Sequence, residues 1–478
     1  MRFIRPPLSL EEFLGNWRSR PGYGDILAMA GPLILSTSMM CIQQFIDRMF
    51  LCWYSPKAIA AALPAGIFSF TFLSFFIGTA SYVNTFVAQY YGARQPDRMS
   101  AAVWQSLYFS CGAGLIMIPL AWLGEPLFAW AGHAIEIRPM EITYYRILCL
   151  GGGFAVYFSA ISGFFTGRGE TWIVLWVNLG VAAFNIMLDY AMIFGRWGLP
   201  AMGIAGAAWA TIISSACGAL AFTILFLSSK NRSQFHTGRA WAFNPRLFKR
   251  LMVYGLPAGM QFMLDLLAFS CFVFFIGRIG TLELGATNLA FQINSLAFMP
   301  MIGLGIATST LVGHHLGDNQ PQLAHRATWL AFHMGFVYMT SIALCYFFLP
   351  GLFIDPFGAN AAPGEFASLR GMAIVILRFV AIYSVFDTMN LIFAHALKGA
   401  GDTRFVMWFT FSLGFAIMVF PAWLACRPGG GGIYLAWTFL SVYVIILGFC
   451  LLARFQHGAW QTMRVIESHS VGAISAES

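Results

Sequence analysis

The sequence predicts an all-α polytopic membrane protein with twelve transmembrane helices in two six-helix lobes. Hydrophobic residues make up 59% of the 478 residues and charged residues 10%, whereas a soluble chain of this length would carry about 25% charged residues. Apolar stretches of about 20 residues, the length that crosses a bilayer, recur along the chain. The chain also repeats itself in two halves. These observations exclude a soluble protein and leave no basic domain that would bind nucleic acid.

Twelve apolar segments are long enough to cross a membrane as helices. We expect helices over 25–53, 58–88, 101–124, 142–166, 172–195, 203–229, 250–278, 284–314, 327–353, 371–398, 404–425 and 432–455.

The internal repeat aligns residues 32–104 with 257–329 without a gap. Identical residues in this alignment include Pro32/Pro257, Gly78/Gly303, Gly92/Gly317, Gln95/Gln320, Pro96/Pro321 and Trp104/Trp329. Because six helices is an even number, both halves enter the membrane in the same orientation, which predicts a pseudo-twofold axis along the membrane normal. The predicted organisation is an N-terminal segment 1–24, an N-lobe 25–229, a connector 230–249, a C-lobe 250–455 and a tail 456–478.

A second repeated motif predicts two equivalent turns. GRGET at 167–171 matches GAGDT at 399–403, and both fall between the fourth and fifth helices of their half. Glycine permits the backbone angles of a tight turn. Thr171 and Thr403 could cap the helices that follow.

Loop charges predict that both termini are cytoplasmic. Of the 27 lysines and arginines, eighteen fall on the inner side under this topology and nine on the other, in keeping with the positive-inside rule. No cleavable signal peptide is visible at the start of the chain. We therefore expect a multi-pass protein of the plasma membrane, which in a bacterium is the inner membrane. The nine cysteines are scattered singly and show no metal-binding spacing.

Four aspartates lie inside these apolar segments: Asp47, Asp189, Asp265 and Asp387. A charged carboxylate at the bilayer centre costs roughly 2.5–3.5 kcal/mol on insertion scales, and four would cost on the order of 10 kcal/mol without partners or protonation. None of the four aligns with an acid in the other half. The scaffold does not need them, which indicates a path for a proton, an ion or a cationic substrate.

Each acid has polar residues at helical spacing on its own predicted helix. These neighbours are Ser36 and Gln43 for Asp47, Asn178 and Asn185 for Asp189, Gln261 for Asp265, and Tyr383 and Asn390 for Asp387; the helix over 284–314 adds Asn288, Gln292 and Ser295. Such stripes should face a bundle interior or a wet cavity, because lipid offers no hydrogen-bond partners. The alternative is that they only join helices. Arg378 could pair with Asp387 or reach the outer surface.

The coupling ion stays open at this stage. A buried aspartate can exchange a proton, because burial favours its neutral form. Two carboxylates from neighbouring helices, together with other oxygens, could instead hold sodium, and Asp265 with Asp387 is the candidate pair. We favour protons over sodium because Asp189 supplies a carboxyl beside a neutral amide. No cofactor beyond the coupling ion is expected.

Several segments resemble the multidrug and toxic compound extrusion (MATE) transporters. The opening of that family is similar to PLILSTSMMCIQQFIDRMFL, AIAAALPAG and FVAQYYGARQPDR; its middle region resembles the stretch that starts at GRGETWIVLWVNLG; its seventh and eighth helices resemble GLPAGMQFMLDLLAF and TSTLVGHHLGDNQ. The resemblance covers about residues 25 to 455. It implies two six-helix lobes, a V-shaped central cavity, and export driven by inward sodium or proton flow.

The resemblance also implies roles for the acids. The NorM-like branch uses acids on its first, seventh and tenth helices, which fall on Asp47, Asp265 and Asp387. Asp265 stands where a glutamate is often found. A proton-coupled branch uses an Asn and an Asp four residues apart on the fifth helix, matched by Asn185 and Asp189.

The favoured hypothesis is an antiporter that exports organic, cationic or amphipathic small molecules as a monomer within the lipid bilayer. One alternative is a lipid-linked oligosaccharide flippase of the same superfamily, which the scarcity of Lys and Arg in the predicted spans disfavours. The other is an intramembrane enzyme, suggested by the GxGD-like motif in GAGDT. Its twin GRGET instead indicates a structural turn, so no enzyme activity is expected.

Overall fold

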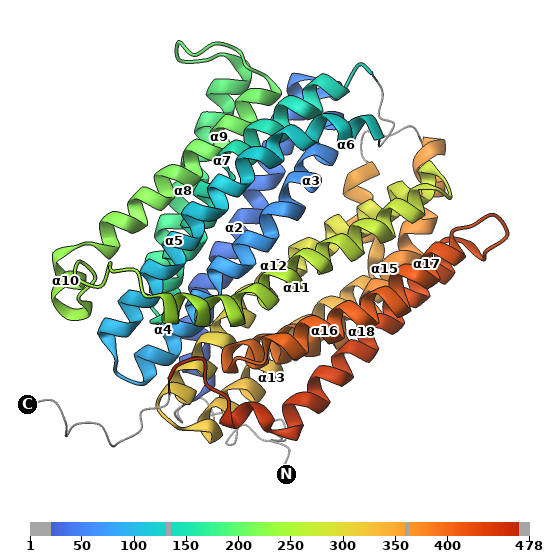
Figure 1. The fold of residues 1–478 in the computed structure, drawn as a ribbon. Coiled ribbons are helices and arrows are strands. Elements are labelled where there is room, and N and C mark those ends of the chain that lie inside the picture. The colour runs from blue at the N-terminus through green and yellow to red at the C-terminus, as the bar shows by residue number, and fades with distance from the viewer. Residues whose placement is uncertain (1–20, 131–134, 359–362, 468–478) are drawn as a thin grey trace, which may run out of the picture.

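The computed structural model describes residues 21–130, 135–358 and 363–467, and helices are the only regular secondary structure in that part of the chain (Figure 1). Twelve of its helical segments are long and apolar enough to cross a membrane. The predicted fold class, an all-α polytopic membrane protein, is confirmed.

The described part of the first half contains eight α-helices. They are α2 (Tyr23–Tyr54), α3 (Pro56–Ser81), α4 (Val83–Gly92), α5 (Pro96–Leu120), α6 (Gly124–Trp130), α7 (Arg138–Gly167), α8 (Thr171–Phe194) and α9 (Ile204–Phe226). The span predicted over 58–88 corresponds to α3 and α4 together, with Tyr82 between them. Proline at the first position starts both α3 and α5, where its missing N–H would have no partner in any case.

The second half follows a short connecting helix, α10 (Ser229–Phe235). Its helices are α11 (Pro245–Gly277), α12 (Thr281–Gly317), α13 (Pro321–Phe348), α14 (Pro350–Ile354), α15 (Pro363–Ala400), α16 (Thr403–Leu413), α17 (Phe420–Ala425) and α18 (Gly432–His457). A π-helical turn, Gly414–Val419, joins α16 to α17. Proline again starts α11 and α13, several residues before the predicted starts.

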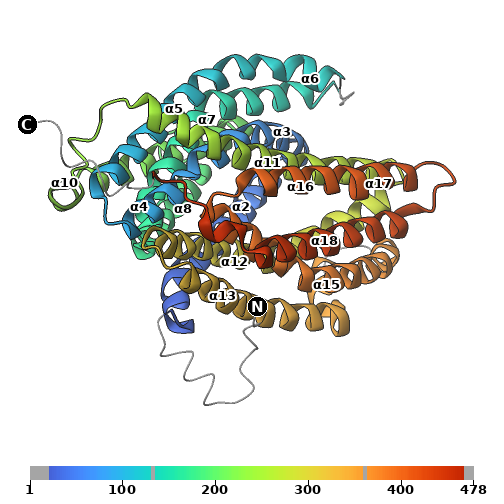
Figure 2. The same ribbon diagram turned by 60° about the horizontal axis from the view of Figure 1, so that its bottom comes forward.

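The helices gather into two lobes. In Figure 1 the first-half helices, blue to green, lie on one side and the second-half helices, yellow to red, on the other, and Figure 2 shows the same separation after a 60° turn. The lobes meet where α2 packs on α12 and α3 packs on α11.

Glycines that align in the repeat make equivalent contacts between the lobes. A Cβ on Gly92 would lie 2.1 Å from the His314 oxygen, and a Cβ on Gly317 would lie 2.1 Å from the Gln89 oxygen. Gln89 and His314 are themselves aligned positions, so the two contacts are related by the predicted pseudo-twofold axis. Only glycine allows the backbones to approach this closely.

The two predicted turns are equivalent. Gly169 and Gly401 have φ of 79° and 111°, which glycine adopts without strain. In each turn the N–H of the acidic residue, Glu170 or Asp402, donates at 2.9 Å to the carbonyl five residues earlier. Both turns also contact α4, so they lie at the same end of the bundle, called the inner end below.

The predicted threonine caps are wrong. Thr171 and Thr403 are the first residues of α8 and α16, not the residues before them. Their hydroxyl oxygens have no hydrogen-bond partner in the structure. The capping positions are occupied by Glu170 and Asp402, whose side chains make no cap hydrogen bond.

Polar contacts join the lobes at the inner end. Asn84 donates to Thr310 Oγ1 at 3.2 Å, and the Tyr82 hydroxyl donates to the Lys398 carbonyl at 2.8 Å. A ring nitrogen of His314 contacts the Gly167 carbonyl at 2.6 Å. The inner ends of the two lobes are therefore closed on each other.

Candidate functional site

The first acid pair lies in the N-lobe, where α2 runs beside α8. Asp47 of α2 and Asp189 of α8 face each other within hydrogen-bonding reach. Asp189 is only 1% exposed. The sequence predicted Asp189 beside Asn185 but did not predict that Asp47 would join them.

Two hydrogen bonds hold the same two helices together. Gln43 Nε2 donates to Asn185 Oδ1 at 2.5 Å, and Asn178 Nδ2 donates to Ser36 Oγ at 2.6 Å. The predicted polar stripes of α2 and α8 therefore face each other along their length. Ser36 pairs with Asn178, Gln43 with Asn185, and Asp47 lies beside Asp189. The amides serve helix packing here, which was the alternative interpretation, and in doing so they fix the position of the acids.

Three of the four carboxylate oxygens of Asp47 and Asp189 lack a hydrogen-bond donor. Asp47 Oδ1 and both carboxylate oxygens of Asp189 are buried without a hydrogen-bond partner. Two ionised carboxylates can only accept hydrogen bonds, so neither satisfies the other. Like charges at this separation repel strongly in a low-dielectric site. The Arg48 charge acts on Asp47, but no cation among the described residues acts on Asp189, so the arrangement favours a proton or another cation between the two residues.

The second acid pair lies in the C-lobe. Asp265 of α11 accepts a hydrogen bond from Gln261 Nε2 at 2.6 Å, and Asp387 of α15 accepts one from Asn390 Nδ2 at 3.2 Å. The two acids are close enough to act on each other electrostatically. Unlike the N-lobe pair, each has an amide donor.

Other predicted residues lie apart from the acid pairs. Tyr383 is buried near Asp387. The side chains of Asn288 and Gln292 on α12 are exposed and have no side-chain hydrogen bond among the described residues. Arg378 lies over the Phe347 ring, 5.6 Å from its centroid. Of the two alternatives for Arg378, the ion pair with Asp387 is not among those formed by the described residues.

Four residues near the acids were missed by sequence reasoning. Arg48, next to Asp47 on α2, acts electrostatically on that carboxylate. Tyr144 of α7 lies close to both acids of the N-lobe pair, and Tyr443 of α18 lies close to both acids of the C-lobe pair. Lys398 of α15 acts on Asp265. A tyrosine in an aromatic-rich chain carries no spacing signal, and Lys398 was counted with the inner loop charges.

No larger metal centre accompanies these pairs. Within the described ranges, no group of three His, Cys, Asp or Glu side chains is placed to hold a metal ion.

Comparison with known proteins places this fold in a family. Residues 32–191 and 257–423 each match the family described as MatE, one match in each half. The chain belongs to the MATE family. The protein is therefore a cation-coupled efflux transporter and not an enzyme, as the sequence predicted.

Relatives within the family share about a quarter of their residues with this chain. A protein of Pseudomonas syringae pv. tomato named "Probable multidrug resistance protein NorM" is 26% identical over 454 residues, covering 94% of this chain and 97% of its own. A protein of the same name from Bradyrhizobium diazoefficiens is 26% identical over 442 residues, covering 90% and 93%.

Solved structures share the fold at lower identity. One described as the outward-facing conformation of a multidrug resistance MATE family transporter superposes with a TM-score of 0.82 at 18% identity, over 96% of this chain and 99% of that one. The fold of this multi-pass membrane protein is therefore that of solved MATE transporters.

Proposed function

We propose that this transporter exports organic, cationic or amphipathic small molecules in exchange for protons, by alternating access across the plasma membrane. The protein works as a monomer with both termini cytoplasmic. Asp47 and Asp189 form the proton site. Relatives named as multidrug resistance proteins support the substrate class, and acidic side chains in the apolar spans suit cations.

The observation that carries the choice of ion is the set of unpartnered oxygens at the N-lobe pair. One shared proton supplies the missing donor and removes the repulsion between the two carboxylates. Sodium would need several converging oxygens. One oxygen that could contribute, Asn185 Oδ1, already accepts the hydrogen bond from Gln43 Nε2.

A second candidate is sodium coupling at Asp265 and Asp387, the site that the family resemblance suggested. Its support is that the two acids lie close enough to interact. Against it, Asp265 is already bonded to Gln261 and lies near the ammonium of Lys398, and both would compete with sodium.

The test is transport in proteoliposomes. Purified protein is reconstituted, and export of ethidium is followed under a pH gradient without sodium, and under a sodium gradient at clamped pH. We expect the pH gradient to drive export, and Asp189→Asn to abolish it. Glu136→Gln is the matched control, because Glu136 is an exposed acid paired with Lys57.

Export that follows the sodium gradient and survives Asp189→Asn would contradict proton coupling at the N-lobe pair. If Asp387→Asn abolished that sodium-driven export, the C-lobe site would replace it as the coupling site.

A further inference from the structure

Lys398 points into the C-lobe and not toward the solvent at the inner end. Its Nζ donates to Gln261 Oε1 at 2.7 Å, and Gln261 Nε2 donates to Asp265 Oδ2 at 2.6 Å. Lysines near the end of a membrane helix usually extend to the interface. Arg404, the second residue of the next helix, α16, does lie exposed. One amide thus bridges an ammonium on α15 to a carboxylate on α11.

We propose that the Lys398 ammonium is the resident counter-cation of the Asp265 carboxylate. When a coupling or substrate cation binds at Asp265, that cation replaces Lys398 as the charge that balances the carboxylate. This inference rests on the proposed transport cycle and adds a positioning residue to it. Between binding events the carboxylate is balanced by the ammonium through Gln261. Asp265 therefore stays ionised without a captured ion, whereas Asp189 in the N-lobe pair has no such counter-cation among the described residues.

The surroundings leave Lys398 as the cation that balances this site. The titratable groups that face Asp265 and Lys398 are Asp387 and His395 from α15 and Tyr443 from α18. His395 Nδ1 contacts the Leu391 carbonyl at 2.7 Å, so this nitrogen donates within its own helix. On the N-lobe side, Tyr82 bonds the backbone carbonyl of Lys398 and not its ammonium.

The test reads the protonation of Asp265 directly. Dicyclohexylcarbodiimide reacts with protonated carboxyls, and mass spectrometry quantifies the modified Asp265 peptide against pH in nanodiscs. A positive neighbour stabilises the carboxylate, so its removal lets the acid hold its proton to higher pH. We expect Lys398→Gln to move the labelling midpoint upward by about one pH unit, a tenfold change in proton affinity. Lys398→Arg and the exposed control Arg404→Gln should stay near the wild-type midpoint.

A second variant guards against a folding defect. Gln261→Leu keeps the ammonium but removes the bridge, and it should shift the midpoint in the same direction by less. An unchanged midpoint in Lys398→Gln, or an equal shift in Lys398→Arg, would overturn the role of the charge. Labelling needs no transport, so this outcome is separate from a failure of drug export in proteoliposomes.

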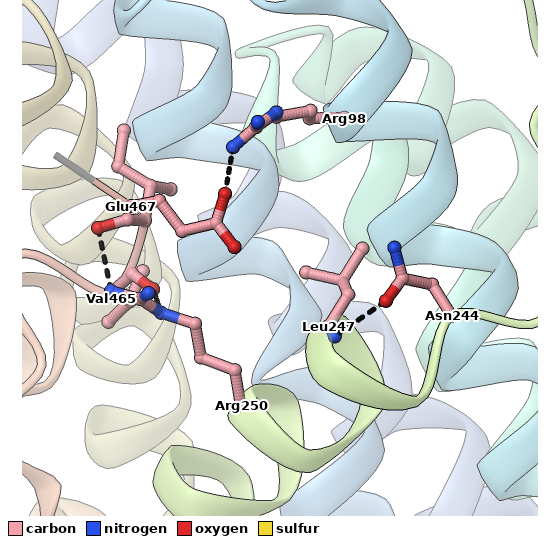
Figure 3. Close-up of polar contacts among 7 residues, drawn as sticks. Arg98, Asn244, Leu247, Arg250, Val465 and Glu467 are labelled. Carbon is pink, nitrogen blue, oxygen red and sulfur yellow. Dashed lines mark hydrogen bonds and ion pairs between the residues drawn. The ribbon is translucent and has the colours of Figure 1, made fainter. Parts of the chain in front are cut away.

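An independent observation concerns the segment after α18, which crosses between the lobes at the inner end. The buried Trp460 stacks on Phe455 and donates to its carbonyl at 2.8 Å, which anchors the segment to α18. Beyond it, the backbone of Val465 and Ile466 meets Arg250 of α11, and Arg250 Nη2 donates to Ile466 at 2.7 Å. Figure 3 shows Arg250 reaching to Val465.

The same segment also contacts the N-lobe. Val465 N donates to Gln89 Oε1 at 2.9 Å, and Gln89 Nε2 donates to the Gly399 carbonyl at 2.9 Å. Glu467 forms an ion pair with Arg98 of α5 (Figure 3). Gln89 and Val465 are both fully buried. The segment is therefore bonded to both lobes at once.

We infer that residues 463–467 act as a clamp that holds the inner ends of the lobes together. Opening toward the cytoplasm separates α4 and α5 from α11 and α15, and the clamp cannot keep all these contacts as they part. It therefore favours the inside-closed state. The Gln89 amide is the central contact because it bonds the clamp and the C-lobe turn together.

Hydrogen exchange tests the clamp in nanodiscs. A chain that ends after Thr462 loses the clamp, whereas a chain that ends after Glu467 keeps every contact described above and serves as the control. We expect amide exchange in peptides covering 84–95 and 313–320 to rise at least severalfold in the shorter chain, with the outer peptide 56–66 unchanged. Gln89→Leu in the full chain should raise exchange in the same inner peptides.

Equal exchange in the two truncated chains would overturn the clamp. A rise that includes 56–66 would also overturn it, because it would indicate general destabilisation and not inner opening.

Discussion

A methyl group added to Gly92 tests the inner contact between the lobes. The new Cβ would lie 2.1 Å from the His314 oxygen, where ordinary contacts begin near 3.4 Å. The backbones must therefore separate by more than 1 Å. The neighbour is a backbone carbonyl of a packed helix, which cannot move aside as a flexible side chain could.

Overpacking of this kind costs about 1–3 kcal/mol, which corresponds to a change of about 5- to 150-fold in a two-state equilibrium. The cost applies only while the lobes are closed at the inner end, since opening removes His314 from the methyl group. Gly92→Ala should therefore shift the population toward the inside-open state. Gly317→Ala should do the same, because its Cβ meets the Gln89 oxygen at the same distance.

The assay is the labelling of a cysteine placed at Thr310, which is buried between the lobes. A water-soluble maleimide is applied, and peptide mass spectrometry separates this site from the nine native cysteines. Thr310→Cys should label at least fivefold faster in the Gly92→Ala background. The control is Gly112→Ala, where a Cβ meets nothing within 4 Å and where alanine should stabilise the helix slightly.

Equal labelling rates in the Gly92→Ala and Gly112→Ala backgrounds would refute the reasoning. An equal loss of folded protein in Gly92→Ala and Gly112→Ala would refute it as well, because the effect would then come from damage to the helix and not from separation of the lobes.

Three further outcomes follow from the structure. Asp47→Asn should abolish pH-driven ethidium export while leaving folded protein, and normal export at equal protein level would contradict the shared proton. Asp265→Asn and Asp387→Asn should each reduce export at least tenfold in the same assay. At the outer surface, a hydrogen bond from Arg370 lowers the pKa of Asp355, so the benefit of this pair is present at neutral pH and is lost only as acid titrates through the lowered pKa. Because the pair is exposed, Asp355→Asn should leave the melting temperature at neutral pH unchanged within error, and a clear drop would show that the pair matters more than its exposure indicates.

Much of the fold could be predicted because the bilayer restricts the choices. Apolar stretches of the right length have to become helices in lipid, and all twelve did. Helix starts were harder. Residues at the amphipathic ends, such as those from Pro245 onward in α11, belong to the helix but are too polar to be counted in an apolar span. The break at Tyr82 gives no signal in an apolar run.

The candidate site was predicted in part for a similar reason. Helical spacing shows which residues share a face, so the stripe ending at Asp47 and the stripe ending at Asp189 were both found. Spacing does not show which helices are neighbours. That the two stripes meet depends on α2 packing on α8, which is decided by the whole bundle. Lys398 was missed because only the packing decides whether a long side chain turns inward or toward water.

The two lobes share a scaffold but not its chemistry. The contacts that close the inner end are symmetric, since Gly92 with His314 is the counterpart of Gly317 with Gln89. The acids are not symmetric in this way: three of the four carboxylate oxygens of the N-lobe pair have no donor, whereas the C-lobe pair has amide donors and a lysine nearby. Binding of an ion changes the charge balance less at a site whose carboxylate already has a counter-cation than at the N-lobe site, where Asp189 has none. The closing contacts should therefore tolerate exchange between halves, whereas under the proposed proton coupling the N-lobe acids set the step at which a captured proton lets the lobes move.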